Sequence, residues 1–158
     1  MLRYALVAGL LLGSSAQAQL RIASLPDVYE SYNDCFSATE EGIDLAALES
    51  LGWKRATMQS GNGEPIADGP IIYGHAERAP VILFSGAEGK GVCVVTARLK
   101  DIEQFKKFKS AWGDALPQPN DEGEIWFMAE GRMVQMALTG SREEPSVRLI
   151  VATPSESE

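Results

Sequence analysis

The chain has 158 residues, of which 45% are hydrophobic, and its 14 basic and 22 acidic residues give a net charge of −8. This composition is typical of a globular protein and excludes the collagen, coiled-coil and wholly disordered classes. The acidic balance argues against nucleic acid and anionic membrane surfaces as partners, because both are bound largely through Lys and Arg.

Residues 1–18 have the pattern of a secretory signal peptide. Arg3 provides the positive start, residues 5–12 form an apolar run, and Ala-Gln-Ala at 16–18 matches the small-x-small cleavage pattern. The apolar run is too short to span a membrane, which takes roughly 20 residues. Cleavage after residue 18 removes Arg3, so the net charge falls from −8 to −9. The new first residue, Gln19, is not the cysteine of a lipid anchor. We therefore expect an exported protein of bacterial type, periplasmic or secreted, without a membrane anchor.

The predicted mature chain keeps two cysteines, Cys35 and Cys93. An even count in an exported protein predicts a disulfide. Closing so long a loop stabilises a fold by roughly 4 kcal/mol when the effect is assigned to chain entropy. The alternatives are two buried thiols, or one reactive thiol near His75.

Two helices are predicted at the start of the mature chain. Ser24 opens a capping box, so the first helix runs to about residue 38, and Cys35 lies on its apolar face against the core. The second helix covers residues 44–51 and ends at Gly52, where a left-handed cap is needed. Trp53 follows the cap and is expected to pack back on the last helical turn as a core residue.

The middle of the chain predicts strands and one long loop. A short strand is expected at residues 54–59 and a turn-rich loop at 60–70, whereas residues 71–77 fit either a strand or a helical turn. Residues 81–85 and 91–99 form the clearest strand pair, a hairpin in which Leu83 lies opposite Cys93. Both faces of this hairpin are apolar, so we expect it deep in the sheet with cover on each side.

The C-terminal half predicts one amphipathic helix, residues 101–112, and three strands at 124–129, 132–139 and 146–152. Residues 153–158 are expected to form a flexible acidic tail. The element order predicts one domain, residues 19–152, of the α+β class. Its antiparallel sheet of five to six strands packs with the two N-terminal helices, and the third helix is inserted between the hairpin and a C-terminal three-stranded meander.

No catalytic motif is complete. Residues 84–91 fail the phosphate-loop pattern, because Phe84 stands where a glycine is needed and Gly91 where a Ser or Thr is needed. Ser85 lacks the flanking glycines of a nucleophile elbow. Together with His75, the single histidine, Ser85 still defines one alternative, a small hydrolase.

The clusters of charged residues are explained by local structure rather than by a metal, catalytic or binding site. The acidic loop at 120–124 fails the calcium-loop pattern and is interpreted as a turn, and the acidic pairs at 40–41 and at 101 and 103 are attributed to helix starts. Four lysines between residues 100 and 109 are interpreted as a solvated helix face. We expect no metal and no cofactor.

Strand parity in the last hairpin gives one surface that suggests binding. If Glu130 and Gly131 form a two-residue turn, one side of the hairpin presents Trp126, Met128 and Met133. Uncovered, this side suggests a partner protein or a small apolar ligand, because Trp and Met are common at adaptable binding surfaces. The sequence favours the other interpretation, in which the third helix or the N-terminal helices cover it.

The observations together favour an exported, non-enzymatic binding or interaction protein of the cell envelope. A disulfide between Cys35 and Cys93 holds it, and the side that carries Trp126 binds its partner. One alternative is a small periplasmic hydrolase that uses Ser85 and His75. Another is a purely structural or envelope-assembly role.

Overall fold

The computed structural model describes residues 20–66 and 69–155, so the predicted signal peptide lies outside the described residues. The described chain consists, in order, of α1 (Leu25–Ser37), α2 (Leu45–Ser50), β1 (Trp53–Arg55), β2 (Ile71–His75), β3 (Val81–Phe84), β4 (Val92–Arg98), α3 (Ile102–Ser110), the 3-10 helix η1 (Gly113–Ala115), β5 (Glu124–Ala129), β6 (Arg132–Gly140) and β7 (Pro145–Ala152).

The seven strands form one antiparallel sheet in the order β1-β2-β3-β4-β7-β6-β5. The predicted α+β class is confirmed, with one strand more than the five to six expected. The additional strand is β2, in the segment that fitted either a strand or a helical turn. β1 is shorter than predicted and ends at Arg55.

Each α-helix begins after a residue whose side chain accepts a backbone N–H. Ser24 Oγ accepts from Asp27 at 3.2 Å, as the capping box predicts. The carboxylates of Asp44 and Asp101 do the same for α2 and α3. A cap of this kind stabilises a helix by about 1 kcal/mol, so the start of each helix is fixed locally.

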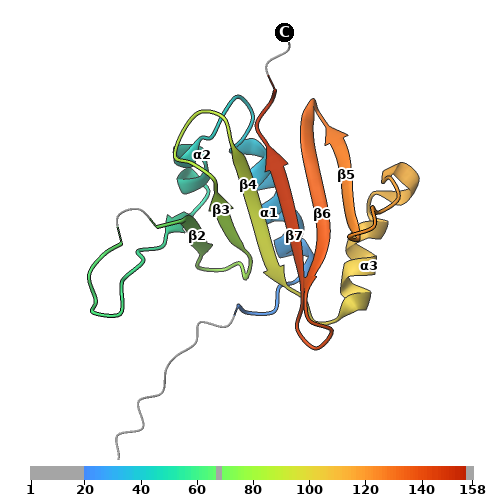
Figure 1. The fold of residues 1–158 in the computed structure, drawn as a ribbon, viewed down its shortest axis with the longest axis horizontal. Helices are drawn as coiled ribbons and strands as arrows, with labels where there is room; N and C mark the ends of the chain where they lie inside the picture. Colours follow the sequence, from blue (N-terminus) through green and yellow to red (C-terminus); the bar gives the residue numbers. More distant parts are fainter. Residues whose placement is uncertain (1–19, 67–68, 156–158) are drawn as a thin grey trace, which may run out of the picture.

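The three α-helices pack on the same face of the sheet (Figure 1). The Tyr29 ring of α1 stacks on the Phe108 ring of α3, with centroids 4.8 Å apart. On the other side of α1, the Tyr73 hydroxyl of β2 donates to Glu49 Oε1 of α2 at 2.8 Å. Burial and this hydrogen bond raise the pKa of Tyr73 to about 12, so the phenol keeps its proton at physiological pH.

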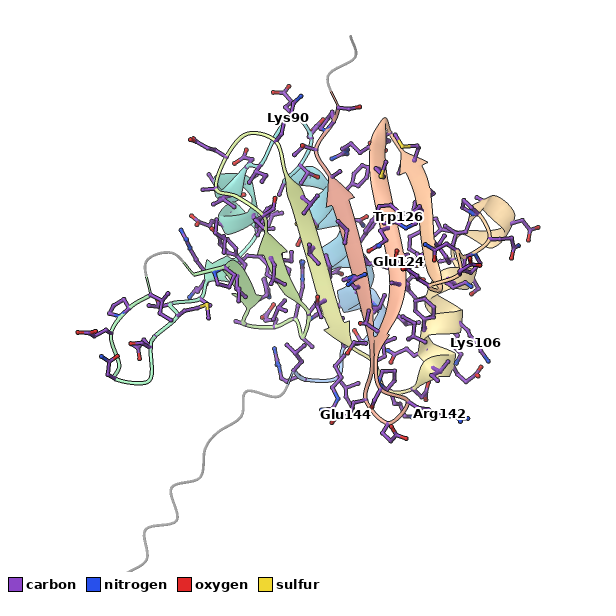
Figure 2. The ribbon with its side chains drawn as sticks, in the orientation of Figure 1. Lys90, Lys106, Glu124, Trp126, Arg142 and Glu144 are labelled. Carbon is purple, nitrogen blue, oxygen red and sulfur yellow. A yellow bond between two sulfur atoms is a disulfide. The ribbon has the colours of Figure 1, made fainter. Side chains whose placement is uncertain are left out.

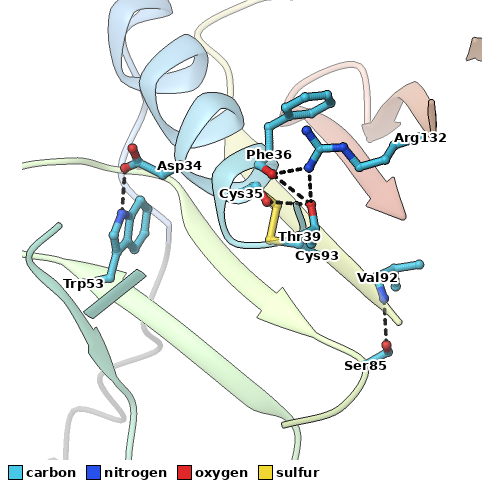
Figure 3. The surroundings of a disulfide bond; sticks show 9 residues. All are labelled: Asp34, Cys35, Phe36, Thr39, Trp53, Ser85, Val92, Cys93 and Arg132. Carbon is cyan, nitrogen blue, oxygen red and sulfur yellow. Dashed lines mark hydrogen bonds between the residues drawn. A yellow bond between two sulfur atoms is a disulfide. The ribbon is translucent and has the colours of Figure 1, made fainter. Parts of the chain in front are cut away.

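The predicted disulfide between Cys35 and Cys93 is confirmed. It joins α1 to the central strand β4, with the two Cα atoms 5.8 Å apart and both side chains fully buried. Figure 3 shows it beneath the last turn of α1. Both cysteines of the chain are used, so neither of the free-thiol alternatives holds.

A half-buried acidic residue next to the disulfide ties α1 to the first strands. Asp34 accepts a hydrogen bond from Trp53 Nε1 at 2.8 Å (Figure 3). It also pairs with the Arg78 guanidinium. Arg78 also pairs with Glu30 at 3.1 Å. Trp53 is only 1% exposed, which confirms the prediction that it is a core residue.

The predicted register of the β3–β4 hairpin is wrong by one residue, because Phe84 and not Leu83 lies opposite Cys93. Ser85 lies opposite Val92, to whose carbonyl it donates its N–H at 3.1 Å, so the connecting loop is one residue longer than predicted. Gly91 instead bonds Thr153: its N–H donates to Thr153 Oγ1 at 3.1 Å and its carbonyl accepts from Thr153 N–H at 2.9 Å. Gly91 therefore extends the ladder between β4 and β7. Thr153, 8% exposed, is tied to the sheet, so the predicted flexible tail does not begin there.

The prediction that both faces of this hairpin are covered is also wrong. Ile82 and Phe84 lie on the face packed against the helices and are buried. Val81 and Leu83 point to the opposite face and are only half-buried. All three α-helices of the described chain cover one face, so the apolar side chains on the other face have no α-helix over them.

Candidate functional site

The open face, defined as the sheet surface opposite the helices, carries a row of apolar side chains outside the core. Its central row crosses six strands at matching register positions and consists of Ile72, Leu83, Val94, Ile150, Gln135 and Trp126. Four aliphatic side chains of this row are half-buried. Monomeric proteins rarely leave a contiguous apolar surface uncovered, so the open face is the first candidate for binding.

Three side chains on the open face are strongly exposed: Trp126 at 43%, Met128 at 63% and Met133 at 51%. The predicted register is confirmed, with Met128 opposite Met133. It is fixed by the two-residue turn at Glu130 and Gly131, whose φ angles of 50° and 77° suit a type I′ hairpin.

The expectation that a helix covers these three side chains is wrong. α3 packs on the opposite side of the sheet, where Trp112, just beyond its end, faces Phe127 of β5 at a centroid distance of 6.5 Å. Phe127 alternates with Trp126 along the strand, so a helix that covers Phe127 leaves Trp126 uncovered.

Two charged residues hold the Trp126 side chain in place. Trp126 Nε1 donates to Glu124 Oε2 at 3.1 Å, and Arg148 Nη2 of β7 donates to Glu124 Oε1 at 3.0 Å. Figure 2 shows Glu124 and Trp126 together at the β5 side of the sheet. The carboxylate thus links the indole to an arginine two strands away and keeps an exposed aromatic ring oriented on the open face.

The open face also contains two buried polar atoms that have no hydrogen-bond partner in the described part of the chain, Gln135 Oε1 and Arg148 Nε. Gln135 is 3% exposed and lies opposite Trp126. Buried polar groups are nearly always paired, so these two atoms make the region beside Trp126 unusual. A ligand group reaches them only if the side chains around them move.

Ser85 and His75 are not brought together. The pairing of Gly74 with Val81 and of Ile71 with Phe84 places them at opposite ends of the β2–β3 pair, roughly 15 Å apart along the strands. Ser85 Oγ accepts from Val92 N–H at 2.9 Å.

The ring of His75 is engaged in the fold. Nδ1 accepts from Glu77 N–H at 3.1 Å, and Nε2 lies 3.3 Å from the Leu51 carbonyl. The ring also meets Trp53 edge-on at 5.4 Å. These contacts fit the neutral tautomer protonated on Nε2, which supports the turn after α2 and leaves no nitrogen for a nucleophile.

Of the acidic pairs, Asp101 and Glu103 lie at the start of α3 as predicted, whereas the interpretation of Glu40 and Glu41 as a helix start is wrong, because α2 begins only at Leu45.

Among residues 20–66 and 69–155, no three His, Cys, Asp or Glu side chains are arranged to hold a metal ion. In the acidic loop, Asn120 Oδ1 accepts from the N–H groups of Glu122 and Glu124, which is a turn. On α3, Lys106 pairs with Glu103 at 2.6 Å on an exposed face.

The comparisons with known proteins give no relative: no protein-family model, no curated protein and no solved structure matches the chain. No helix of the described residues is long and apolar enough to cross a membrane.

Proposed function

We propose that this chain is an exported, non-enzymatic binding protein that engages a partner protein through the open face around Trp126, Met128 and Met133. The observation that carries the proposal is the joint exposure of these three side chains on a sheet face without a helix. Trp is enriched among residues that dominate binding energy, and Met adapts to irregular partners.

A protein fits this surface better than a small ligand does. Small apolar ligands bind in concave sites that bury most of their surface. Four surface hollows are lined by residues of other regions: the loop after α3, the start of α1, the segment after β1 and the α1–α2 connection. A fifth, of about 170 Å³, lies at the far end of the open face beside Arg98 and Ser146. None of the five includes Trp126, Met128 or Met133.

Export is supported by two independent features. Residues 1–18 have the composition of a signal peptide. The disulfide between Cys35 and Cys93 is of a kind that persists in oxidising compartments and is rare in the cytosol. A protein that binds its partner outside the cytoplasm would account for the signal-peptide pattern, the disulfide and the exposed open face.

The proposal predicts that Trp126→Ala weakens capture of a partner from extracts of the producing cells by about thirtyfold, which corresponds to about 2 kcal/mol. The matched control is Leu51→Ala, because Leu51 is exposed to 44% at the end of α2, away from the open face. Quantitative mass spectrometry of proteins retained on the immobilised chain measures the difference. Circular dichroism checks that both variants stay folded.

A protein retained by the wild type and by Leu51→Ala, and lost with Trp126→Ala, supports the proposal. Equal retention by all three chains contradicts it, because the exposed indole then contributes nothing to binding.

A further inference from the structure

β5 forms one end of the sheet, and its outer side has free backbone groups. Glu124 N–H donates to Asn120 Oδ1 at 2.8 Å, and the Glu124 carbonyl accepts from Asn120 N–H at 2.9 Å. These groups therefore point away from β6. Because successive residues of a strand alternate in direction, the N–H and C=O groups of Trp126 and Met128 point outward as well.

Nothing in the described chain pairs with these outward groups. β5 is hydrogen-bonded to β6 alone, and no backbone bond of Trp126 or Met128 beyond that ladder occurs within residues 20–66 and 69–155. The same two residues carry exposed side chains on the open face. Backbone donors and acceptors and apolar side chains are thus presented together on one strand.

The two edges of the sheet differ in how they are protected. β1 has three residues, and two of them, Lys54 and Arg55, are exposed cations. Short, charged strands are the usual defence against unwanted pairing. β5 has six residues, contains no Pro, Lys or Arg, and exposes Trp126 and Met128 instead. The protected edge and the unprotected edge lie at opposite ends of the same sheet (Figure 1).

Acidic residues lie at both ends of β5. Asp121 and Glu122 are exposed just before it, and the Glu130 side chain is 82% exposed just after it. A second copy of β5 paired about Phe127 would bring Glu130 opposite Glu124, two carboxylates that already pair with Arg132 at 3.7 Å and Arg148 at 3.0 Å, so self-association gains no opposite charge there. A segment with basic residues at its ends would instead meet opposite charges.

We propose that β5 accepts an extended segment of a partner protein as an eighth strand, apolar at its centre and basic at its ends. The backbone of this segment forms hydrogen bonds with the backbone of Trp126 and Met128. Every second side chain of the segment packs on the open face beside the Trp126 and Met128 side chains. In this mode of recognition, strand addition, the main-chain hydrogen bonds supply the affinity. This inference rests on the proposed function and specifies how the partner binds.

The probe is the capped peptide Lys-Lys-Val-Thr-Val-Thr-Val-Lys-Lys, added to the folded chain at low salt. Hydrogen exchange read by NMR should show the Trp126 and Met128 amides protected by the bound peptide. A peptide with Glu in place of every Lys should bind about tenfold more weakly or less. The Lys peptide N-methylated at its valines and threonines should lose binding to the same extent, because its five central residues cannot donate backbone hydrogen bonds.

The protein variant is Met128→Pro, which removes one outward N–H at an edge position where proline is tolerated. It should weaken peptide binding by about tenfold, whereas Leu51→Ala, at the exposed end of α2 and away from the open face, should change it by less than about threefold. Absence of binding by the Lys peptide, or equal binding by its N-methylated form, overturns the inference without involving any variant that might misfold.

The same variants distinguish this inference from the proposed function. If Trp126→Ala abolishes partner capture and Met128→Pro leaves it unchanged, the open face binds through side chains alone and strand addition is wrong. If neither variant alters capture, both the strand addition and the proposed function fail.

Discussion

Replacement of both Cys35 and Cys93 by Ala is expected to lower the free energy of unfolding by about 4 kcal/mol. The bond closes a loop with a sequence separation of 58 residues, and its loss restores freedom mainly to the unfolded chain. Domains of this size have a total stability of about 5 to 15 kcal/mol, so the variant should unfold at much lower urea concentration. Urea titration followed by circular dichroism measures the change.

The control for this prediction is the wild-type chain reduced in denaturant and then refolded and titrated with reductant present, which keeps the two sulfur atoms as thiols. If the cross-link is responsible, the reduced chain loses nearly as much stability as the double variant. A loss below about 1 kcal/mol in both would show that the disulfide does not stabilise the fold.

Arg132→Ala is expected to cost about 3 kcal/mol of stability. Arg132 is only 4% exposed; its guanidinium donates to the Phe36 carbonyl and, at 3.2 Å, to Thr39 Oγ1, and lies 3.4 Å above the Phe36 ring (Figure 3). It thus places a cation at the C-terminal end of α1, which has no basic residue of its own in its last turn.

Two further variants test that explanation. Arg132→Lys should recover only part of the loss, since an ammonium group neither stacks flat on Phe36 nor presents a planar fork of donors. Arg142→Ala, in the exposed loop between β6 and β7, should stay within about 0.5 kcal/mol of the wild type. Similar unfolding midpoints for Arg132→Ala and Arg142→Ala would contradict the role given to Arg132.

The register of β5 and β6 could be predicted from the sequence, whereas that of β3 and β4 could not. Glu130 and Gly131 leave a two-residue connection whose geometry fixes every pair of the hairpin. The connection from β3 to β4 is longer, and Gly91, predicted to lie opposite Ser85, bonds instead to Thr153, which lies 62 residues further along the chain. Only the folded chain shows that contact.

Cover of the sheet is the second property that strand patterns could not predict. Apolar residues on both faces of β3 and β4 indicate burial only if enough helices exist for two layers. The described chain has three α-helices, and contacts such as Tyr29 with Phe108 gather them on one face. The same arrangement exposes Trp126.

Part of the candidate site was missed for a similar reason. Trp126, Met128 and Met133 followed from strand parity within one hairpin. Glu124 and Arg148, which hold the indole, come from strands that are not neighbours, so the parity of a single hairpin does not relate them. The sequence did carry a signal for this contact. The alternation of residues 146–152, combined with the strand order of the meander, places Arg148 and Glu124 on the same face of the sheet.

The central claim is that the open face binds a partner protein. Its most direct test is photo-crosslinking in the producing cells. The photoreactive residue p-benzoylphenylalanine replaces Met128 or Met133 in the chain, and it replaces Leu51 in the control. We expect the chains substituted at positions 128 and 133 to cross-link to the same polypeptide. The chain substituted at position 51 should give no such product. An absence of adducts at 128 and 133, or the same adducts at 51, would contradict the claim.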